Sequence, residues 1–141
     1  MRDQYEICRA AELSSLAAFR DLIDSVSQEH PDIRPETWFD LKLAVDEACA
    51  NIVLHGYAGM NPGSIMLALV LEPQQIVVTL TDFGHPFEPC EPPAPDLTAV
   101  PGDGTTTSFG LFFIYQTMDE IHYRTAEDGN HLTFVKLLGE E

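Results

Sequence analysis

The sequence predicts one α+β domain, a single β-sheet with helices on one face. Strand-like and helix-like segments follow in the order β-α-α-β-β, then a long irregular segment, then α-β-β. The chain has 141 residues, 45% of them hydrophobic and 21% charged, as in ordinary globular proteins. A chain of this length can bury about two-thirds of its unfolded surface. Because no internal repeat is visible, we expect residues 1–141 to form one domain.

The N-terminal part is predicted to supply an edge strand and two helices. Residues 5–9 alternate weakly, as an edge strand does. Residues 11–28 have apolar side chains at helical spacing, which predicts an amphipathic helix. A second helix is expected from residue 35 or 36 to about His55, closed by Gly56.

A β-hairpin is expected next. The β-rich runs 64–71 and 76–81 are separated by Glu72-Pro73-Gln74-Gln75, which predicts an antiparallel pair. The second run ends at Asp82, which is followed by Phe83-Gly84-His85-Pro86-Phe87.

Residues 87–108 hold five prolines, two glycines and three threonines in a row, with no periodicity. Such a segment inside a compact domain is a functional lid or a disordered insert. A helix over 109–118 and two strands over 120–124 and 132–138, joined by a turn at 127–130, complete the predicted fold.

The charge of the chain is unusual, with 7 Lys and Arg against 23 Asp and Glu and a net charge of -16. DNA and anionic membranes repel such a surface, so direct binding to nucleic acid or membrane is not expected. A basic protein partner, a metal-bound ligand or simple solubility remain open. No Lys or Arg lies between Lys42 and Arg124, so this stretch must hold any anion through backbone N–H groups, hydroxyls or a metal ion.

The cysteines and the apolar runs favour a cytoplasmic protein. Three cysteines, none in a C-x-x-C pair, make a disulfide framework or a zinc site improbable. Residues 1–6 have no apolar core of a signal peptide, and the longest apolar run, 65–71, is too short to span a bilayer as a helix.

Three polar residues form a row on the second predicted helix. Glu47, Asn51 and His55 are spaced four apart and flank an apolar stripe. Asparagine offers a neutral oxygen to Mg²⁺, and glutamate can orient or deprotonate a hydroxyl. The alternative is a row that faces solvent or makes contacts within the fold.

Two further motifs could bind a ligand. Asp82 could accept a hydrogen bond from the exocyclic amine of a base, with Gly84 allowing close approach, or it could form an Asx turn. Ser108-Phe109-Gly110-Leu111 leads into a helix, whose N-terminus can receive phosphate, or Ser108 could simply cap that helix.

In this order the motifs resemble those of the anti-sigma factor serine kinases of the RsbW and SpoIIAB type, which belong with the ATPases of gyrase, histidine kinases and MutL. The similar segments are 46–57 (N-box), 82–87 (first glycine box), 109–114 with 118–121 (second glycine box) and 129–133 (end of the pattern). The resemblance spans roughly 39–136. It implies the histidine-kinase-like ATPase (Bergerat) fold, a two-layer α/β sandwich with a mixed, mostly antiparallel sheet and helices on one face.

The resemblance implies roles for the matching residues. Asn51 would bind a Mg²⁺ that bridges the phosphates of ATP, and Glu47 would be the general base toward an acceptor hydroxyl. Asp82 would accept from the adenine amine, with Thr133 nearby through water, and residues 87–108 would be the ATP lid. The other implied nucleotide-binding residues are His55, Gly84, Pro86, Phe87, Ser108, Gly110 and Leu111.

The resemblance is incomplete where the phosphates would bind. Ser108 replaces the first glycine of a G-x-G-L pattern, and Tyr115 stands where an arginine is common. No lid residue carries a positive charge. Because phosphoryl transfer depends on positioning and charge neutralisation, these departures weaken the expectation of catalysis more than that of Mg-ATP binding.

The leading hypothesis is a cytoplasmic, homodimeric serine kinase that phosphorylates an anti-sigma-factor antagonist and sequesters a sigma factor. The alternative is a partner-switching module without catalysis. The catalytic domain of a two-component histidine kinase would need a phosphoacceptor helix pair, and the first ~35 residues hold one helix. A metal hydrolase built on His55 and His85 would lack paired ligand spacing.

Overall fold

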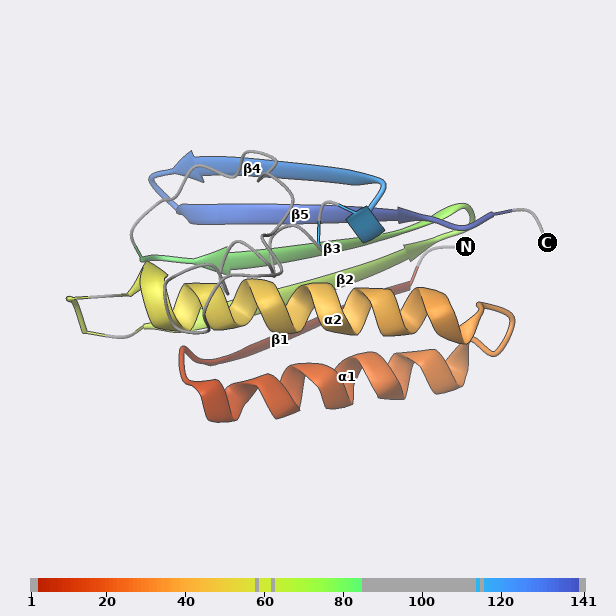
Figure 1. Cartoon of the computed structure of the whole chain (residues 1–141), viewed down its shortest axis with the longest axis horizontal. Helices are drawn as coiled ribbons and strands as arrows, with labels where there is room; N and C mark the ends of the chain where they lie inside the picture. The colour runs from red at the N-terminus through yellow and green to blue at the C-terminus, as the bar shows by residue number, and fades with distance from the viewer. Residues whose placement is uncertain (1–2, 58, 62, 85–113, 115, 140–141) are drawn as a thin grey trace, which may run out of the picture.

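The protein has two layers, a five-stranded antiparallel sheet and a pair of helices packed on one of its faces (Figure 1). The computed structural model describes residues 3–57, 59–61, 63–84, 114 and 116–139. The strands are β1 (Asp3–Ala10), β2 (Ser64–Glu72), β3 (Gln75–Asp82), β4 (Glu120–Ala126) and β5 (Gly129–Leu137). The helical elements are η1 (Leu13–Ser15), α1 (Leu16–Glu29), α2 (Pro35–Asn51) and the π turn η2 (Ile52–Gly56).

The strand order is β1-β2-β3-β5-β4, and all four pairings between these described strands are antiparallel. β1 is at the edge, as predicted. The expected mixed sheet is not seen among these strands, and the connections explain why. The helix pair returns the chain to the end of β1, where the Ala11 N–H donates to the Gly63 carbonyl, so β2 begins beside the point where β1 stopped. The short turns at residues 73–74 and 127–128 make the pairs β2–β3 and β4–β5 antiparallel as well.

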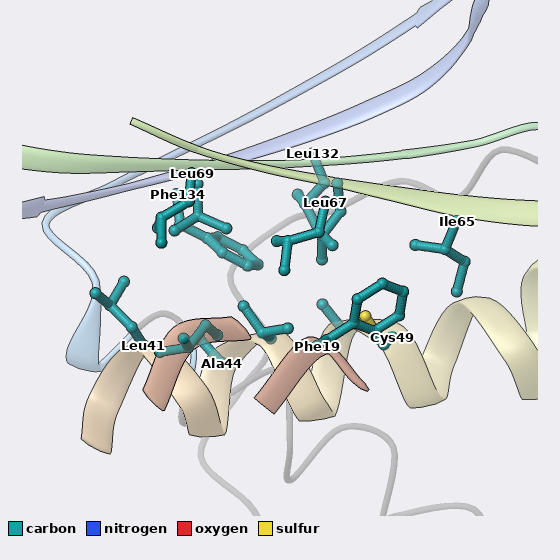
Figure 2. Close-up of a cluster of buried hydrophobic side chains, with 14 of the residues drawn as sticks. Phe19, Leu41, Ala44, Cys49, Ile65, Leu67, Leu69, Leu132 and Phe134 are labelled. Carbon is teal, nitrogen blue, oxygen red and sulfur yellow. The ribbon is translucent and has the colours of Figure 1, made fainter. Parts of the chain in front are cut away.

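The helices bury one face against the sheet and hold each other with ion pairs. Figure 2 shows side chains of α1 and α2 directed at those of β2 and β5. Arg20 of α1 binds Asp46 of α2 at 3.0 Å, and Lys42 of α2 binds Asp24 of α1 at 2.9 Å. The residues of this core with no exposed surface include Phe19, Ile23, Leu41, Val45, Ile65, Leu67, Leu69, Ile76, Leu80 and Phe134.

Several predicted boundaries differ from the observed ones. The first predicted helix opens with the 3₁₀ turn η1, and the second ends in η2 instead of regular α-helix. Since β5 begins at Gly129, its turn contains only residues 127 and 128. The hairpin turn shortens likewise to residues 73 and 74. The predicted lid lies outside the described residues, as does most of the helix predicted over 109–118.

Within the described part of the chain, no helix combines the length and the apolar character needed to cross a lipid bilayer.

Candidate functional site

The candidate site lies where the end of β3, the start of β5 and the end of η2 meet. Asp82 is the last residue of β3 and is 4% exposed. Asn130 lies directly across from it on β5 and is 3% exposed. Gly56 ends η2 beside them, because a Cβ on Gly56 would lie 3.9 Å from the Asp82 Oδ1 atom. Two buried polar side chains therefore share the helix-covered face at this end of the sheet.

The two oxygens of Asp82 have different surroundings. Oδ1 accepts hydrogen bonds from the Gly84 N–H at 2.8 Å and from the Asn130 Nδ2 at 3.0 Å. Among the residues that the structure describes, none donates to Oδ2. The Asx turn considered from the sequence is thus formed, but it uses only one oxygen. The other oxygen keeps its capacity to accept a hydrogen bond from a ligand.

Gly84 is required by the fold itself. A Cβ at this position would lie 2.3 Å from the Gly56 carbonyl oxygen and 2.6 Å from its carbon. Gly129, with φ at +117°, is similarly tight, because its Cβ would meet the Asp82 carbonyl oxygen at 2.7 Å. The sequence suggested that Gly84 lets a ligand approach. In the structure, its lack of a side chain also lets the backbone at Gly84 lie against the backbone of Gly56.

Tyr57 ties the same region together, a role that sequence reasoning missed. Its hydroxyl donates to the Ser64 carbonyl and accepts from the Phe83 N–H, both at 2.9 Å. Burial is the largest cause that raises the pKa of Tyr57. The phenol therefore stays neutral near pH 7 and joins the start of β2 to the residue after Asp82.

Of the predicted row, Glu47 and Asn51 lie on the flank of α2 away from α1, and His55 lies in η2. Asp46, which faces α1 through its ion pair with Arg20, is five residues before Asn51 and so ~140° from it at 100° per residue. From Glu47 to Asn51 the helix rises about 6 Å at 1.5 Å per residue, and η2 continues the chain to Gly56, which lies beside Asp82.

Glu47 and Asn51 are half-buried polar groups. Burial, followed by the neighbouring charge of Asp46, raises the pKa of Glu47 above its ordinary value. No hydrogen bond joins the Asn51 amide side chain to another residue of the described chain. Both groups therefore have unused capacity to bind a polar ligand.

The turn η2 sets how this helix ends. The Tyr57 N–H donates to the Ile52 carbonyl at 3.2 Å, the wide i to i+5 bond of a π turn. Such turns are rare in proteins overall, but those that do occur are frequently at functional sites. Here the turn brings Gly56 against Gly84.

The structure does not bring Thr133 to Asp82. Successive strand residues point to opposite faces, and Thr133 is three positions from Asn130, the partner of Asp82. The Thr133 hydroxyl lies instead 3.3 Å from that of Thr79, on the face that the helices leave uncovered. Its predicted contact with an adenine beside Asp82 is corrected accordingly, and Asn130 occupies the place expected for it.

The remaining predicted site residues, Pro86, Phe87, Ser108, Gly110 and Leu111, lie outside the described residues, as does His85. In the part of the chain that is described, no three His, Cys, Asp or Glu side chains are grouped as a metal centre. His55 is exposed at the end of the row.

A hollow of about 650 Å³ lies at the opposite end of the sheet and is lined by residues 72–75 with Leu137 and Leu138. Its carboxylate, on Glu72, accepts a hydrogen bond from Gln75 at 2.7 Å. The site residues predicted from the sequence are not among the residues that line this hollow.

The residues present suit a nucleotide with a divalent cation. A base amine requires an acceptor, which Asp82 Oδ2 supplies, and a hard cation prefers oxygen ligands such as the Asn51 amide. The half-buried Glu47 carboxylate lies one helical turn before Asn51.

Comparisons with known proteins bear on the family of the chain. The family model described as histidine kinase-like ATPase domain matches residues 9–136. A serine/threonine-protein kinase, BtrW, of Bordetella bronchiseptica is 30% identical over 95 residues, 67% of each chain. An anti-sigma F factor of Anoxybacillus flavithermus is 24% identical, over 70% of this chain and 68% of that protein. A serine-protein kinase RsbW of Bacillus licheniformis is 28% identical, over 72% of this chain and 66% of that protein.

Among solved structures, the histidine kinase domain of a blue-light activated histidine kinase from Erythrobacter litoralis has the same fold. The TM-score is 0.51 at 18% identity, over 89% of this chain and 60% of that one. The chain thus spans about two-thirds or less of the length of these proteins.

Proposed function

Because this chain belongs to the histidine kinase-like ATPase domain family, we propose that it binds ATP with Mg²⁺ and phosphorylates a serine of an antagonist protein. In the proposed cycle it also sequesters a sigma factor. Its relatives include serine-protein kinases and an anti-sigma F factor, which supports this choice within the family. One observation carries most weight: buried Asp82 has one oxygen that accepts no hydrogen bond from the described residues. Asp82 lies beside Gly56 at the end of η2, which continues the helix that bears Glu47 and Asn51.

The proposed role of Asp82 is to select the base. Its Oδ2 would accept from an adenine amine, while Oδ1 stays bonded to Gly84 and Asn130. A buried acceptor left without a donor costs about 1–3 kcal/mol. A base without an amine at this position would therefore bind less tightly.

The proposed roles of Asn51 and Glu47 concern the phosphates. The Asn51 amide oxygen would be a ligand of Mg²⁺, which when bound neutralises phosphate charge. Glu47 would accept the proton of the attacking serine hydroxyl. Burial raises the pKa of this carboxyl and so makes it a stronger base than an exposed glutamate.

A second function, partner switching without phosphoryl transfer, is favoured by the cations of the described chain. Lys42, Lys136 and Arg20 bind Asp24, Asp40 and Asp46 at 2.9, 3.4 and 3.0 Å. Arg124 lies 3.9 Å from Asp128. These four cations already have acidic partners, and residues 43–123 contain no Lys or Arg. Without a cation in this stretch to neutralise the phosphates, the chain would hold a nucleotide without transferring its terminal phosphoryl group.

The proposed assembly is a homodimer, with α1 and the uncovered face of the sheet as candidate partner surfaces. Size-exclusion chromatography with light scattering would give the oligomeric state directly.

The test of ATP binding is calorimetric titration of the protein with ATP, with and without Mg²⁺. Asn51→Ala should weaken Mg-ATP binding at least ten-fold, whereas Asn61→Ala, an exposed asparagine outside the row, should leave it unchanged. Absence of wild-type binding at millimolar ATP would rule out the kinase function and leave a protein-interaction module that uses no nucleotide. Binding without phosphorylation of any serine-bearing partner would favour the switching module.

A further inference from the structure

We propose that Asn130 is a positioning residue that holds the carboxylate of Asp82 in the orientation needed to recognise a purine amine. The proposal rests on the nucleotide-binding function above and adds the residue that determines its base specificity. The sequence motif had suggested Thr133, not Asn130, as the residue near the adenine.

The hydrogen bonds of Asn130 fix its own amide. Nδ2 donates to the Asp82 Oδ1 at 3.0 Å and to the Gly84 carbonyl at 2.9 Å. Both partners are acceptors, and an amide nitrogen has two hydrogens, so the nitrogen must be the atom that faces them. Rotation by 180° would place the amide oxygen against two acceptor oxygens. Asn130 is only 3% exposed, which makes such a mismatch costly.

Those bonds in turn fix Asp82. The terminal torsion of an aspartate is broad, so its two oxygens exchange places easily unless partners distinguish them. The Gly84 N–H alone is a weak constraint, because it lies two residues along the same chain and moves with Asp82. Asn130 donates from a different strand, so it ties Oδ1 to the sheet. Oδ2 is thereby held in the one remaining direction.

Asn130 cannot recognise a base by donation itself. Both of its amide hydrogens are used, one by Asp82 and one by Gly84. Asn130 thus has no donor left for a ring nitrogen of a base. A base amine is itself a donor, and the proposal assigns it to Asp82 Oδ2, so that Asn130 acts on it by orienting that carboxylate.

The backbone at the start of β5 allows the contact between Asn130 and Asp82. Gly129 adopts φ of +117°, and any Cβ there would meet the Asp82 carbonyl oxygen at 2.7 Å. The glycine lets the next residue, Asn130, pair directly opposite Asp82. Directly opposed residues on one face of an antiparallel pair have Cβ atoms about 5 Å apart, within reach of a short amide side chain.

The experiment compares two ligands on each variant of the full chain. ATP carries the 6-amino group, and purine riboside triphosphate is the same molecule without it. Wild type, Asn130→Ala and Asp82→Asn are titrated with both in the presence of Mg²⁺. The measured quantity is the ratio of the two dissociation constants within one variant, which does not depend on the fraction of folded protein.

Wild type should prefer ATP about ten-fold, the effect of one hydrogen bond to a charged group. In Asn130→Ala this preference should fall to below about three-fold, while purine riboside triphosphate binds as it does to wild type. If Asn130 only stabilised the fold, the binding of both ligands would weaken by the same factor and the preference for ATP would persist. That result would overturn the proposal. Loss of wild-type binding to both ligands would instead defeat the proposed function, and this proposal with it.

Discussion

Gly84→Ala should destabilise the protein through a backbone collision beside the candidate site. The added methyl carbon would lie 2.3 Å from the Gly56 carbonyl oxygen and 2.6 Å from the Gly56 carbonyl carbon. Ordinary contacts of this kind are longer than 3 Å, so either η2 or the backbone at Gly84 must move. Both obstacles are backbone atoms, which cannot rotate away as a side chain would.

The size of the effect follows from what must move. Overpacking of this kind costs about 1–3 kcal/mol. Moving Gly84 also disturbs two hydrogen bonds, its N–H to Asp82 at 2.8 Å and its carbonyl with Asn130 at 2.9 Å. Each is worth about 1 kcal/mol net. We therefore expect a loss of about 3–5 kcal/mol in the free energy of unfolding.

Urea denaturation followed by circular dichroism measures this loss. Gly59→Ala is a matched control, because Gly59 has φ of +77° but nothing within 4 Å of an added Cβ. It should cost only the left-handed strain of about 1–2 kcal/mol. A Gly84→Ala protein as stable as wild type, to within about 0.5 kcal/mol, would show that the two backbones do not cross as described.

Three further results are expected. Tyr57→Phe removes a hydroxyl that bonds two backbone groups at 2.9 Å, and should cost about 1–3 kcal/mol in urea denaturation. Glu47→Gln should raise stability at pH 7 and lose this advantage as the pH falls to 4. The reason is that a raised carboxyl pKa means the folded state binds the proton more tightly than the unfolded state does. Ionised Glu47 therefore opposes folding, and this effect is lost as the pH falls through the folded pKa toward the ordinary carboxyl pKa. Equal pH profiles for the two proteins would contradict this. In a Cys90→Ser background at pH 8, a thiol reagent should modify exposed Cys8 rapidly and buried Cys49 only on unfolding. The reason is that burial, as the largest cause, raises the pKa of Cys49 to about 12, so that its thiol stays protonated in the folded protein. Rapid modification of both thiols in the folded protein would be the contrary result.

Local patterns were sufficient to predict the elements. The apolar spacing of α1 and α2 and the β-rich runs around residues 73 and 74 are periodic over whole elements, so neighbours in sequence determine them. The apolar stripe beside the row is buried, as its helical spacing predicts; it consists of Leu41, Ala44, Val45, Ala48 and Ile52. The ends were less predictable, because the π turn at Ile52–Gly56 depends on the contact of Gly56 with Gly84.

The candidate site was predicted only in part. Asp82 at a strand end and the row on α2 follow from the sequence, and their nucleotide-binding roles remain predictions. Tyr57 gave no sequence signal, because its two partners come from β2 and from the residue after β3. Thr133 was misplaced because a motif match does not reveal which face of β5 a residue occupies.

By itself, the sequence determined the α+β class, the edge position of the first strand, the row of Glu47 and Asn51, and an acidic chain whose middle lacks cations. Each depends on composition or on periodicity within one segment. Only the tertiary structure decided that Asn130, and not Thr133, faces Asp82. It also decided that Gly56 and Gly84 lie beside the Asp82 carboxylate and Gly129 beside the Asp82 backbone carbonyl. The reason is that pairing register joins residues 48 positions apart, and a shift of one residue would turn every side chain of β5 to the other face.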